Sequence, residues 1–184
     1  MKSTFSDWQR EALRDFCVRI QDDGALRAAL KRAVDINSVV GLEAVIRLEE
    51  RALAGSENAR ERDRMARLAI LLAHRCVKRT SANDDPKAPI EGRPLAERFG
   101  EASGEQRLLS PLRFQRLIHG DDDDERLRQL RRALGLLSAE SLHRQHLAEA
   151  WFQLTSPEGR RAFARNYFAP TPNTETTEST EVTP

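Results

Sequence analysis

The chain has 184 residues, of which 39% are hydrophobic and 32% are charged. This length suffices for one large domain or two small domains that share a core, and the charge exceeds the roughly 25% of an average soluble protein. The start, MKSTFSDWQREAL, lacks the apolar core of a signal peptide, and no window is long enough to span a bilayer. We therefore expect a soluble, cytoplasmic protein with no membrane partner.

The net charge of +1 is unevenly distributed along the chain. The segment after Phe168 holds three glutamates and no base, so residues 1–168 carry +4, and leaving out the acidic run Asp121 to Glu125 raises the remainder to +9. Nearly all the basic residues are arginines, whose planar donor groups suit phosphate and stack on bases. This bias favours a nucleic-acid partner, although a genome rich in G and C would produce it as well.

Helical periodicity dominates the first half of the chain. Ser6 and Gln9 have the spacing of a capping box, and a stripe at four-residue steps follows them. A second helix follows the sequence QDDG, and Ser38 is expected to cap a third helix that stops near Gly55. The first stripe consists of Trp8, Ala12, Phe16 and Ile20.

The fourth expected helix has a clear apolar face from Met65 to Val77. Four arginines gather in its first half, where positive charge opposes the helix dipole at a cost of roughly a few tenths of a kcal/mol each. These arginines are Arg60, Arg62, Arg64 and Arg67. Either they have a function, or they form a solvated charged face of the helix. Cys17 and Cys76 lie on apolar stripes without a paired spacing, which indicates two buried thiols.

The second half begins after a polar, proline-rich stretch. A short helix is expected around Leu95 to Phe99, and Ser110-Pro111 and Ser156-Pro157 each place an N-cap before a proline at the first helical position. Two leucine-rich helices lie between those starts, and no alternating β-branched run predicts a strand.

We predict an all-α fold of two small helical-bundle domains with about eight or nine helices. The expected segments are an N-terminal domain over residues 1–80, a loop over 81–94, a C-terminal domain over 95–168 and a disordered acidic tail over 169–184.

No pattern in the chain indicates catalysis, a metal or a cofactor. His143 and His146 are three residues apart but have no recognisable further ligands, so we expect exposed surface histidines. The run Asp121 to Glu125 lacks the glycine and closing glutamate of a calcium loop, whereas acids are favoured in the first turn of a helix. We interpret this run as a helix start.

Arginines on helices are the remaining candidates for function. They flank the acidic run, cluster at the start of the fourth helix and recur on the last helix, so they can line a surface for a phosphate backbone. Aromatic residues make up only 5% of the chain, which indicates binding without sequence preference.

The order of motifs resembles the CasB family, the small subunit of the type I-E CRISPR Cascade surveillance complex. The resembling motifs are RFQRLI, an acidic turn, LRQLRRALGLL, a helix ending AWFQL and the final RRAFARNYF. Weaker similarities to the family are found at Trp8, DGALRAALKRAV, ENARERDRMARLAILLA and PLAERFGEA. The resemblance spans the chain to about Phe168.

The resemblance implies a non-enzymatic, all-helical subunit that is present in two copies beside the backbone subunits carrying the guide RNA. It also implies contacts with the large subunit and with target DNA and the displaced strand of the R-loop. By position, Arg32, Arg60 and Arg160 or Arg161 match basic family positions, and Lys87 is an approximate counterpart of a loop lysine. With the arginines from the helical pattern, the candidate nucleic-acid-binding residues are Arg32, Arg60, Arg64, Lys87, Arg113, Arg116, Arg131, Arg132, Arg160 and Arg161.

Two other functions remain open from the residues themselves. A helix-turn-helix regulator would need a base-reading helix, and the turn after RFQRLIHG is too acidic to lie against DNA comfortably. A protein-interaction adaptor would pair its arginines with acids on its own helices and bind no nucleic acid.

Overall fold

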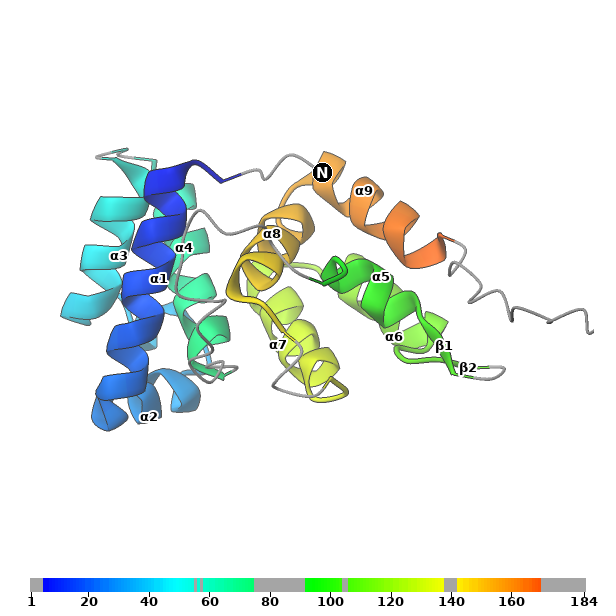
Figure 1. Cartoon of the computed structure of the whole chain (residues 1–184), viewed down its shortest axis with the longest axis horizontal. Coiled ribbons are helices and arrows are strands. Elements are labelled where there is room, and N and C mark those ends of the chain that lie inside the picture. The colour runs from blue at the N-terminus through cyan, green and yellow to red at the C-terminus, as the bar shows by residue number, and fades with distance from the viewer. Residues whose placement is uncertain are drawn as a thin grey trace, which may run out of the picture.

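The computed structural model describes residues 5–54, 56, 58–74, 92–103, 106–137 and 142–169, and within them the fold is all-α, as predicted (Figure 1). The helices of the first half are α1 (Asp7–Asp22), α2 (Gly24–Arg32), the 3-10 turn η1 (Ile36–Ser38), α3 (Glu43–Leu53) and α4 (Ala59–His74). Those of the second half are α5 (Leu95–Gly100), α6 (Pro111–Ile118), α7 (Asp123–Leu134), α8 (Arg144–Leu154) and α9 (Pro157–Phe168). No helix in these ranges combines the length and apolar character needed to cross a membrane.

Local signals in the sequence start several helices where they were expected. The Ser6 amide donates to Gln9 Oε1 at 3.0 Å at the start of α1. Ser156 Oγ accepts the Gly159 amide at 3.1 Å, and Pro157 occupies the first position of α9, where it has no amide to leave unpaired. Trp8 departs from its expected stripe because it is 43% exposed, whereas Phe5 is buried at this end of the molecule.

The third helix begins later than predicted. Ser38 ends the 3-10 turn η1 instead of capping a helix, and both its amide and its hydroxyl donate to Asp35 Oδ1. The helix α3 starts at Glu43. Asp35 is the better acceptor for this short turn, so it holds Ser38 in a local structure that ends before α3.

A small hairpin also departs from the prediction that no strand would form. Strand β1 (Ala102–Ser103) pairs in antiparallel fashion with β2 (Gln106–Arg107) between α5 and α6. Two residues per strand are too few to leave an alternating pattern in the sequence, so this element was not predictable from periodicity. The Arg107 guanidinium anchors it by donating to the carbonyls of Gly100 and Tyr167.

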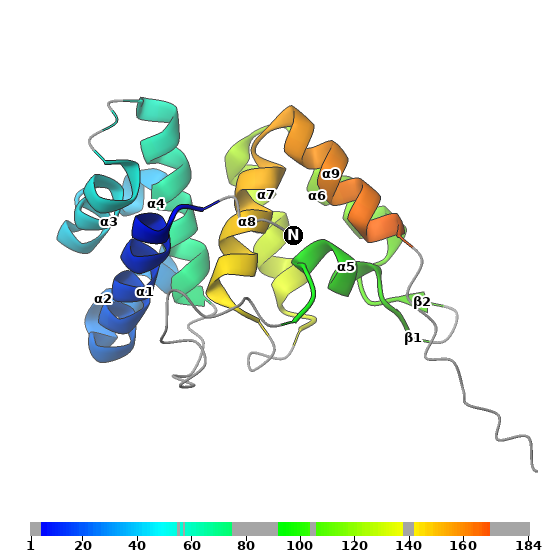
Figure 2. The same cartoon turned by 45° about the horizontal axis from the view of Figure 1, so that its top comes forward.

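The helix α4 lies at the centre of the fold. Between Met65 and Ala73 every residue is buried except Arg67, and α4 packs on α2 and α3 on one side and on α7 and α8 on the other. Figures 1 and 2 show α1 to α4 as one group and α5 to α9 as a second group beside it. One cluster of buried hydrophobic residues spans both groups. The division into domains at residues 81–94 stays a prediction, because most of that segment lies outside the described residues.

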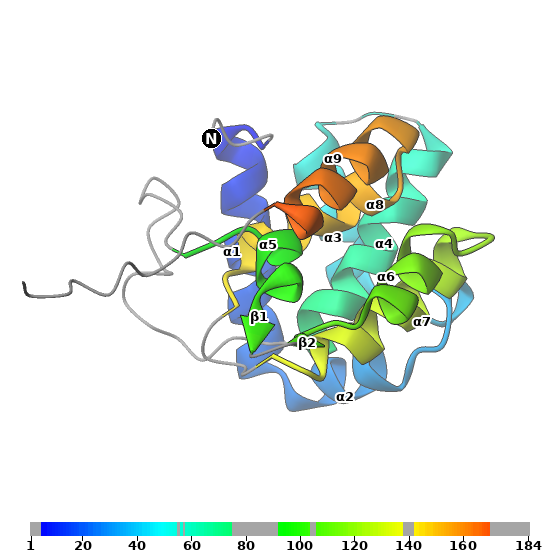
Figure 3. The same ribbon diagram turned by 90° about the vertical axis from the view of Figure 1, so that its right-hand side faces the viewer.

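Aromatic rings hold α9 against α6. The Phe114 ring stacks on Tyr167 with centroids 3.7 Å apart, and the Tyr167 hydroxyl donates to the Leu109 carbonyl at 2.6 Å. Gly100 allows α5 to approach, since a Cβ there would lie 2.1 Å from the Tyr167 carbonyl oxygen. Figure 3 shows α5, α6 and α9 close together at this end of the molecule. The end of α9 is therefore fixed beside α6.

The histidines of α8 are not exposed, contrary to the expectation for this pair. His146 is 8% exposed and His143 is half-buried. His143 is the N-cap of α8, where its Nδ1 accepts the Gln145 amide at 3.2 Å. The sequence HRQH has the polarity of a surface segment, but neighbouring helices cover both faces of α8, and that packing is not visible in local sequence.

The burial of His143 predicts a loss of stability in mild acid. Burial, the neighbouring Arg144 and His146 lower the pKa of His143 from 6.5 to about 4. Between those pH values the unfolded chain binds a proton that folded His143 does not, so protonation favours unfolding as the pH falls. Allowing for its partial exposure, we expect the free energy of unfolding to drop by about 1–2 kcal/mol from pH 7 to pH 4.

Urea unfolding at several pH values measures this effect, with His143→Asn as the matched variant. Asparagine keeps an acceptor at the N-cap but does not titrate in this range. Between pH 7 and pH 4, the free energy of unfolding of the variant should therefore drop by about 1–2 kcal/mol less than that of the parent chain. Equal pH dependence in the two proteins would contradict a role for His143.

The remaining expectations were two buried cysteine thiols, a loop over residues 81–94 and a disordered acidic tail. Cys17 is half-buried and packs against the core, so this thiol is less buried than expected. Cys76, the loop over residues 81–94 as far as Glu91, and the acidic tail from Pro170 lie outside the described residues.

Candidate nucleic-acid interface

The acidic run Asp121 to Glu125 starts α7, as predicted. Asp122 is the N-cap, and its Oδ1 accepts the Glu125 amide at 2.7 Å. This hydrogen bond lowers the pKa of Asp122. Glu125 accepts from Gln129 Nε2 and Arg128, which together hold its pKa below the usual value. The acids thus satisfy unpaired amides of the first turn, where the helix dipole also favours negative charge.

Two acids of this run also bind arginines. Asp124 forms a bidentate pair with Arg67 of α4, with Nε–Oδ1 and Nη2–Oδ2 distances of 2.8 and 3.3 Å. Burial lowers the pKa of Arg67, but the hydrogen bond to Asp124 together with the negative charges of Asp124, Asp123 and Asp63 outweighs burial, so the net shift is upward. Asp123 pairs with Arg126 at 2.9 Å. The acids therefore occupy one arginine of α4 and two of α7.

Three predicted arginines are left on the surface between α6 and α7. Arg113 and Arg116 of α6 and Arg132 of α7 are exposed. Among the described residues none of the three side chains forms a salt bridge or hydrogen bond. They converge on one groove of about 360 Å³, the α6/α7 groove, which is lined by Leu109, Arg113, Arg116, Gln129, Arg132, Ala133 and Leu136. No carboxylate belongs to this lining.

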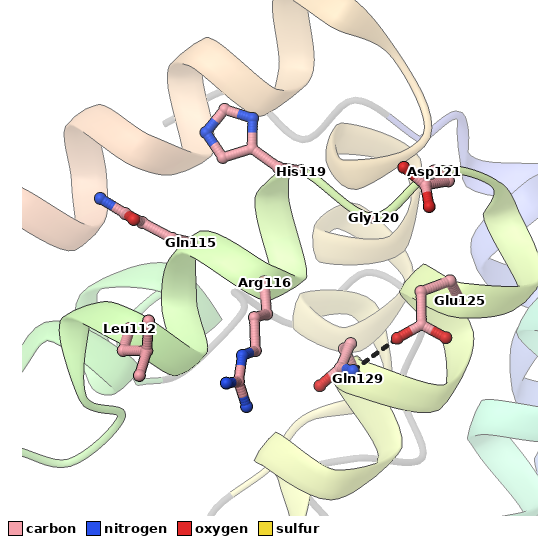
Figure 4. Close-up of a pocket in the computed structure, with 8 residues that line it drawn as sticks. All are labelled: Leu112, Gln115, Arg116, His119, Gly120, Asp121, Glu125 and Gln129. Atoms are coloured by element: carbon pink, nitrogen blue, oxygen red, sulfur yellow. Dashed lines mark hydrogen bonds between the residues drawn. The ribbon is translucent and has the colours of Figure 1, made fainter.

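A second pocket of about 590 Å³, whose lining includes Asp121 and Glu125, adjoins the groove and shares Arg116 and Gln129 with it. Figure 4 shows the Arg116 side chain extending from α6 into the space in front of α7, near Gln129. Gln129 is tied to Glu125, as the dashed line in Figure 4 marks. Arg116 thus lies where the two pockets meet.

Arg131 and Arg32, also predicted, lie where α2 meets α7. Arg131 donates to the carbonyls of Ala33 at 2.7 Å and Lys31 at 3.0 Å, and its burial lowers its pKa. These bonds bring the basic last turn of α2, where Arg32 is exposed, against α7. Arg131 therefore joins the two groups of helices, whereas Arg32 stays available at the surface.

The predicted arginines of α4 and α9 meet at the C-terminal end of α8. Arg64 Nε donates to Thr155 Oγ1 at 2.7 Å and its Nη2 donates to the Phe152 carbonyl at 2.9 Å. Arg60 and Arg160 donate to the carbonyls of Thr155 and Leu154. A helix C-terminus presents unpaired carbonyls and a partial negative charge, so three cations there are favourable.

The three cations at this end of α8 differ in exposure. The Arg64 guanidinium lies 4.3 Å from the Phe152 ring centroid, and burial followed by repulsion from Arg60 lowers its pKa. Arg60 is exposed and Arg160 is half-buried. Arg161, one residue on, is exposed and has no polar partner among the described residues. Lys87 lies outside them. The surface available here thus consists mainly of Arg60 and Arg161.

Sequence patterns could not identify the apolar and neutral walls of the α6/α7 groove. Leu109, Gln129 and Leu136 line it, but their sequence positions look like ordinary helix and loop residues. Among the described residues, no three His, Cys, Asp or Glu side chains are grouped so that they could hold a metal ion. The arrangement of the described residues suits an anionic chain that contacts several guanidinium groups.

Comparison with known proteins gives one family. A family model described as CRISPR-associated protein Cse2 matches residues 26–168, from α2 to the end of α9. No curated protein and no solved structure matches the chain. The match covers most of the chain and leaves α1 outside. It confirms the resemblance that was inferred from the order of the leucine-arginine motifs. The chain therefore belongs to the CRISPR-associated protein Cse2 family, the CasB small subunits of type I-E Cascade, a multisubunit complex of CRISPR defence.

Proposed function

We propose that this subunit binds target DNA and the displaced strand through basic helical surfaces and so stabilises the R-loop. The supporting observation is the convergence of exposed Arg113, Arg116 and Arg132 on a groove lined by no carboxylate. Exchanging a DNA duplex for an RNA–DNA duplex is nearly balanced in free energy, so contacts to a strand backbone can tip the balance. Each neutralised phosphate adds salt-sensitive affinity.

The other predicted arginines divide into two classes. Arg32, Arg60 and Arg161 are exposed and extend the proposed surface, with half-buried Arg160 beside them. Arg64 and Arg131 use their donors on internal carbonyls, and we assign them to holding the interface in place. Lys87 remains a candidate from sequence alone.

Within Cascade, we propose contacts with the backbone subunits, the large subunit, a second copy of this chain and the guide-RNA-bearing assembly. The lining of the α6/α7 groove holds no aromatic ring on which a base could stack, and its guanidinium groups can pair with the phosphates of any sequence. Contacts of this kind position a backbone and carry no sequence information. This argues against a helix-turn-helix regulator.

The salt dependence of single-stranded DNA binding by the full chain tests this proposal. A fluorescent 20-nucleotide oligo(dT) is titrated at several salt concentrations, with a mixed-sequence oligonucleotide as control. We expect log K to fall linearly with log salt, with a slope of about −2 for three phosphates neutralised on a single strand. The two oligonucleotides should bind with similar affinity. An affinity that does not change with salt concentration would contradict the proposal and support a protein-interaction adaptor. A strong preference for one oligonucleotide sequence would contradict it and support a helix-turn-helix regulator.

A further inference from the structure

The last turn of α9 contacts a residue that lines the α6/α7 groove. The helix α9 ends at Phe168, and the next residues of the chain, 170–184, contain three glutamates and no base. Tyr167, in the last turn of α9, donates its hydroxyl to the Leu109 carbonyl at 2.6 Å, and Leu109 lines the groove. Phe114, the neighbour of Arg113 in the chain, stacks on Tyr167. The last described turn of the chain thus contacts one wall of the groove.

The segment 170–184 is long enough to extend well beyond the end of α9. Glu175 follows Ala169 by six residues, a length that spans at most about 20 Å when extended. Glu178 and Glu181 follow at three-residue steps. The cations at the C-terminal end of α8 lie toward the other end of α9, and a helix of 12 residues separates its two ends by about 18 Å, so the crosslinking experiment below must distinguish the two sites.

The α6/α7 groove and residues 170–184 also carry opposite charges. The groove offers three guanidinium groups without a carboxylate in its lining, and the segment offers three carboxylates without a cation. Individual ion pairs at an exposed site are weak. A tethered segment, however, meets the groove at an effective concentration in the millimolar range, so weak pairs can keep it bound for much of the time.

We propose that residues 170–184 dock in the α6/α7 groove against Arg113, Arg116 and Arg132 and compete there with nucleic acid. This inference rests on the proposed function of the groove. A nucleic-acid strand carries a charge on every nucleotide and displaces the segment when it is held in place by the assembled complex. The subunit outside the complex is then protected from non-specific binding to other strands.

Site-specific photo-crosslinking in the full chain tests the docking itself. A benzoylphenylalanine replaces Thr177, between two of the glutamates, and crosslinked peptides are identified by mass spectrometry at low and high salt. We expect crosslinks to α6 and α7 at about 0.05 M salt and their loss at about 0.5 M, because screening weakens exposed pairs. The crosslinks should also disappear when Arg113, Arg116 and Arg132 are changed to alanine. Crosslinks that persist in that variant, or that form mainly with Arg160 and Arg161, would overturn the proposal.

Binding of oligo(dT) tests the competition. The variant Glu175→Gln, Glu178→Gln, Glu181→Gln should bind about fivefold more tightly than the parent chain, which corresponds to three weak ion pairs removed. The matched control is Glu50→Gln, Glu97→Gln, Glu158→Gln, which neutralises three carboxylates elsewhere on the surface of α3, α5 and α9. An equal gain in both variants would mean that only net charge matters, and the competition would then be wrong.

The two assays separate this inference from the proposed function. Salt-sensitive crosslinks to the groove support docking even if oligo(dT) does not bind, in which case the proposed function and the competition fail while the docking stands. Salt-sensitive DNA binding without crosslinks to the groove overturns the docking and leaves the proposed function standing.

Discussion

Changing Arg113, Arg116 and Arg132 together to glutamate is expected to weaken binding of single-stranded DNA about 100-fold at about 0.1 M salt. Three attractive contacts with phosphates become repulsive, and a 100-fold loss corresponds to about 0.9 kcal/mol at each position. The slope of log K against log salt should also become shallower. Fluorescence anisotropy with the oligo(dT) probe measures both quantities.

A second variant, with three arginines outside the groove changed to glutamate, controls for the change in net charge. Arg47, Arg93 and Arg165 are exposed, and the ion pairs of the first two, with Glu43 and Glu101, are also exposed and of little energetic value. Changing these three to glutamate alters the net charge equally but leaves the groove intact. We expect about a tenth of the effect of the groove variant on affinity, or less. Similar losses in the two variants would show that the groove is not a binding site.

Folding of the groove variant is not expected to limit this experiment. The three side chains are exposed, and glutamate and arginine have similar helix propensities. Its thermal midpoint should therefore lie within a few degrees of the parent chain, which circular dichroism measures. In the assembled complex, the same variant should weaken retention of target DNA and leave incorporation of the subunit unchanged.

Replacing Trp151 with alanine is expected to lower the free energy of unfolding by about 3–5 kcal/mol. Trp151 is completely buried in α8, and its Nε1 donates to the Arg64 carbonyl of α4 at 2.8 Å. The substitution leaves a large cavity at the junction of the two helix groups and removes the hydrogen bond to the Arg64 carbonyl. Urea denaturation followed by circular dichroism measures the loss.

Trp8 supplies a matched control, since it is the other tryptophan of the chain and is 43% exposed. Trp8→Ala should cost about 1 kcal/mol or less, because little area is removed from contact. Trp151→Phe should fall between the two, since phenylalanine fills part of the volume but donates no hydrogen bond. Equal destabilisation by the two alanine substitutions would contradict the central position of Trp151.

The contacts of three α4 arginines explain why positive charge is tolerated near the N-terminus of this helix. Arg60, Arg64 and Arg67 lie in the first half of α4, where positive charge opposes the dipole of their own helix. Their guanidinium groups instead reach the carbonyl end of α8 and the acid Asp124 of α7. The cost within α4 is thus offset by favourable charge at two other helix ends, so these arginines have a structural role and do not form a solvated charged face.

Sequence alone determined the helical class and several helix starts. Ser156-Pro157 and the run Asp121 to Glu125 are local signals, because an N-cap needs only an acceptor and an amide three residues further on. The family could also be recognised, since the order of motifs survives even when each motif is unspecific. These features depend on residues close together in the chain.

Tertiary structure decided what the arginines contact and which polar residues are buried. Arg113 and Arg131 look alike in the sequence, yet one faces the α6/α7 groove and the other binds carbonyls at the end of α2. HRQH resembles a surface segment but begins the buried helix α8. In each case the outcome depends on a partner on another helix, often about 90 residues away, and a helical pattern specifies which face is apolar without specifying what covers it.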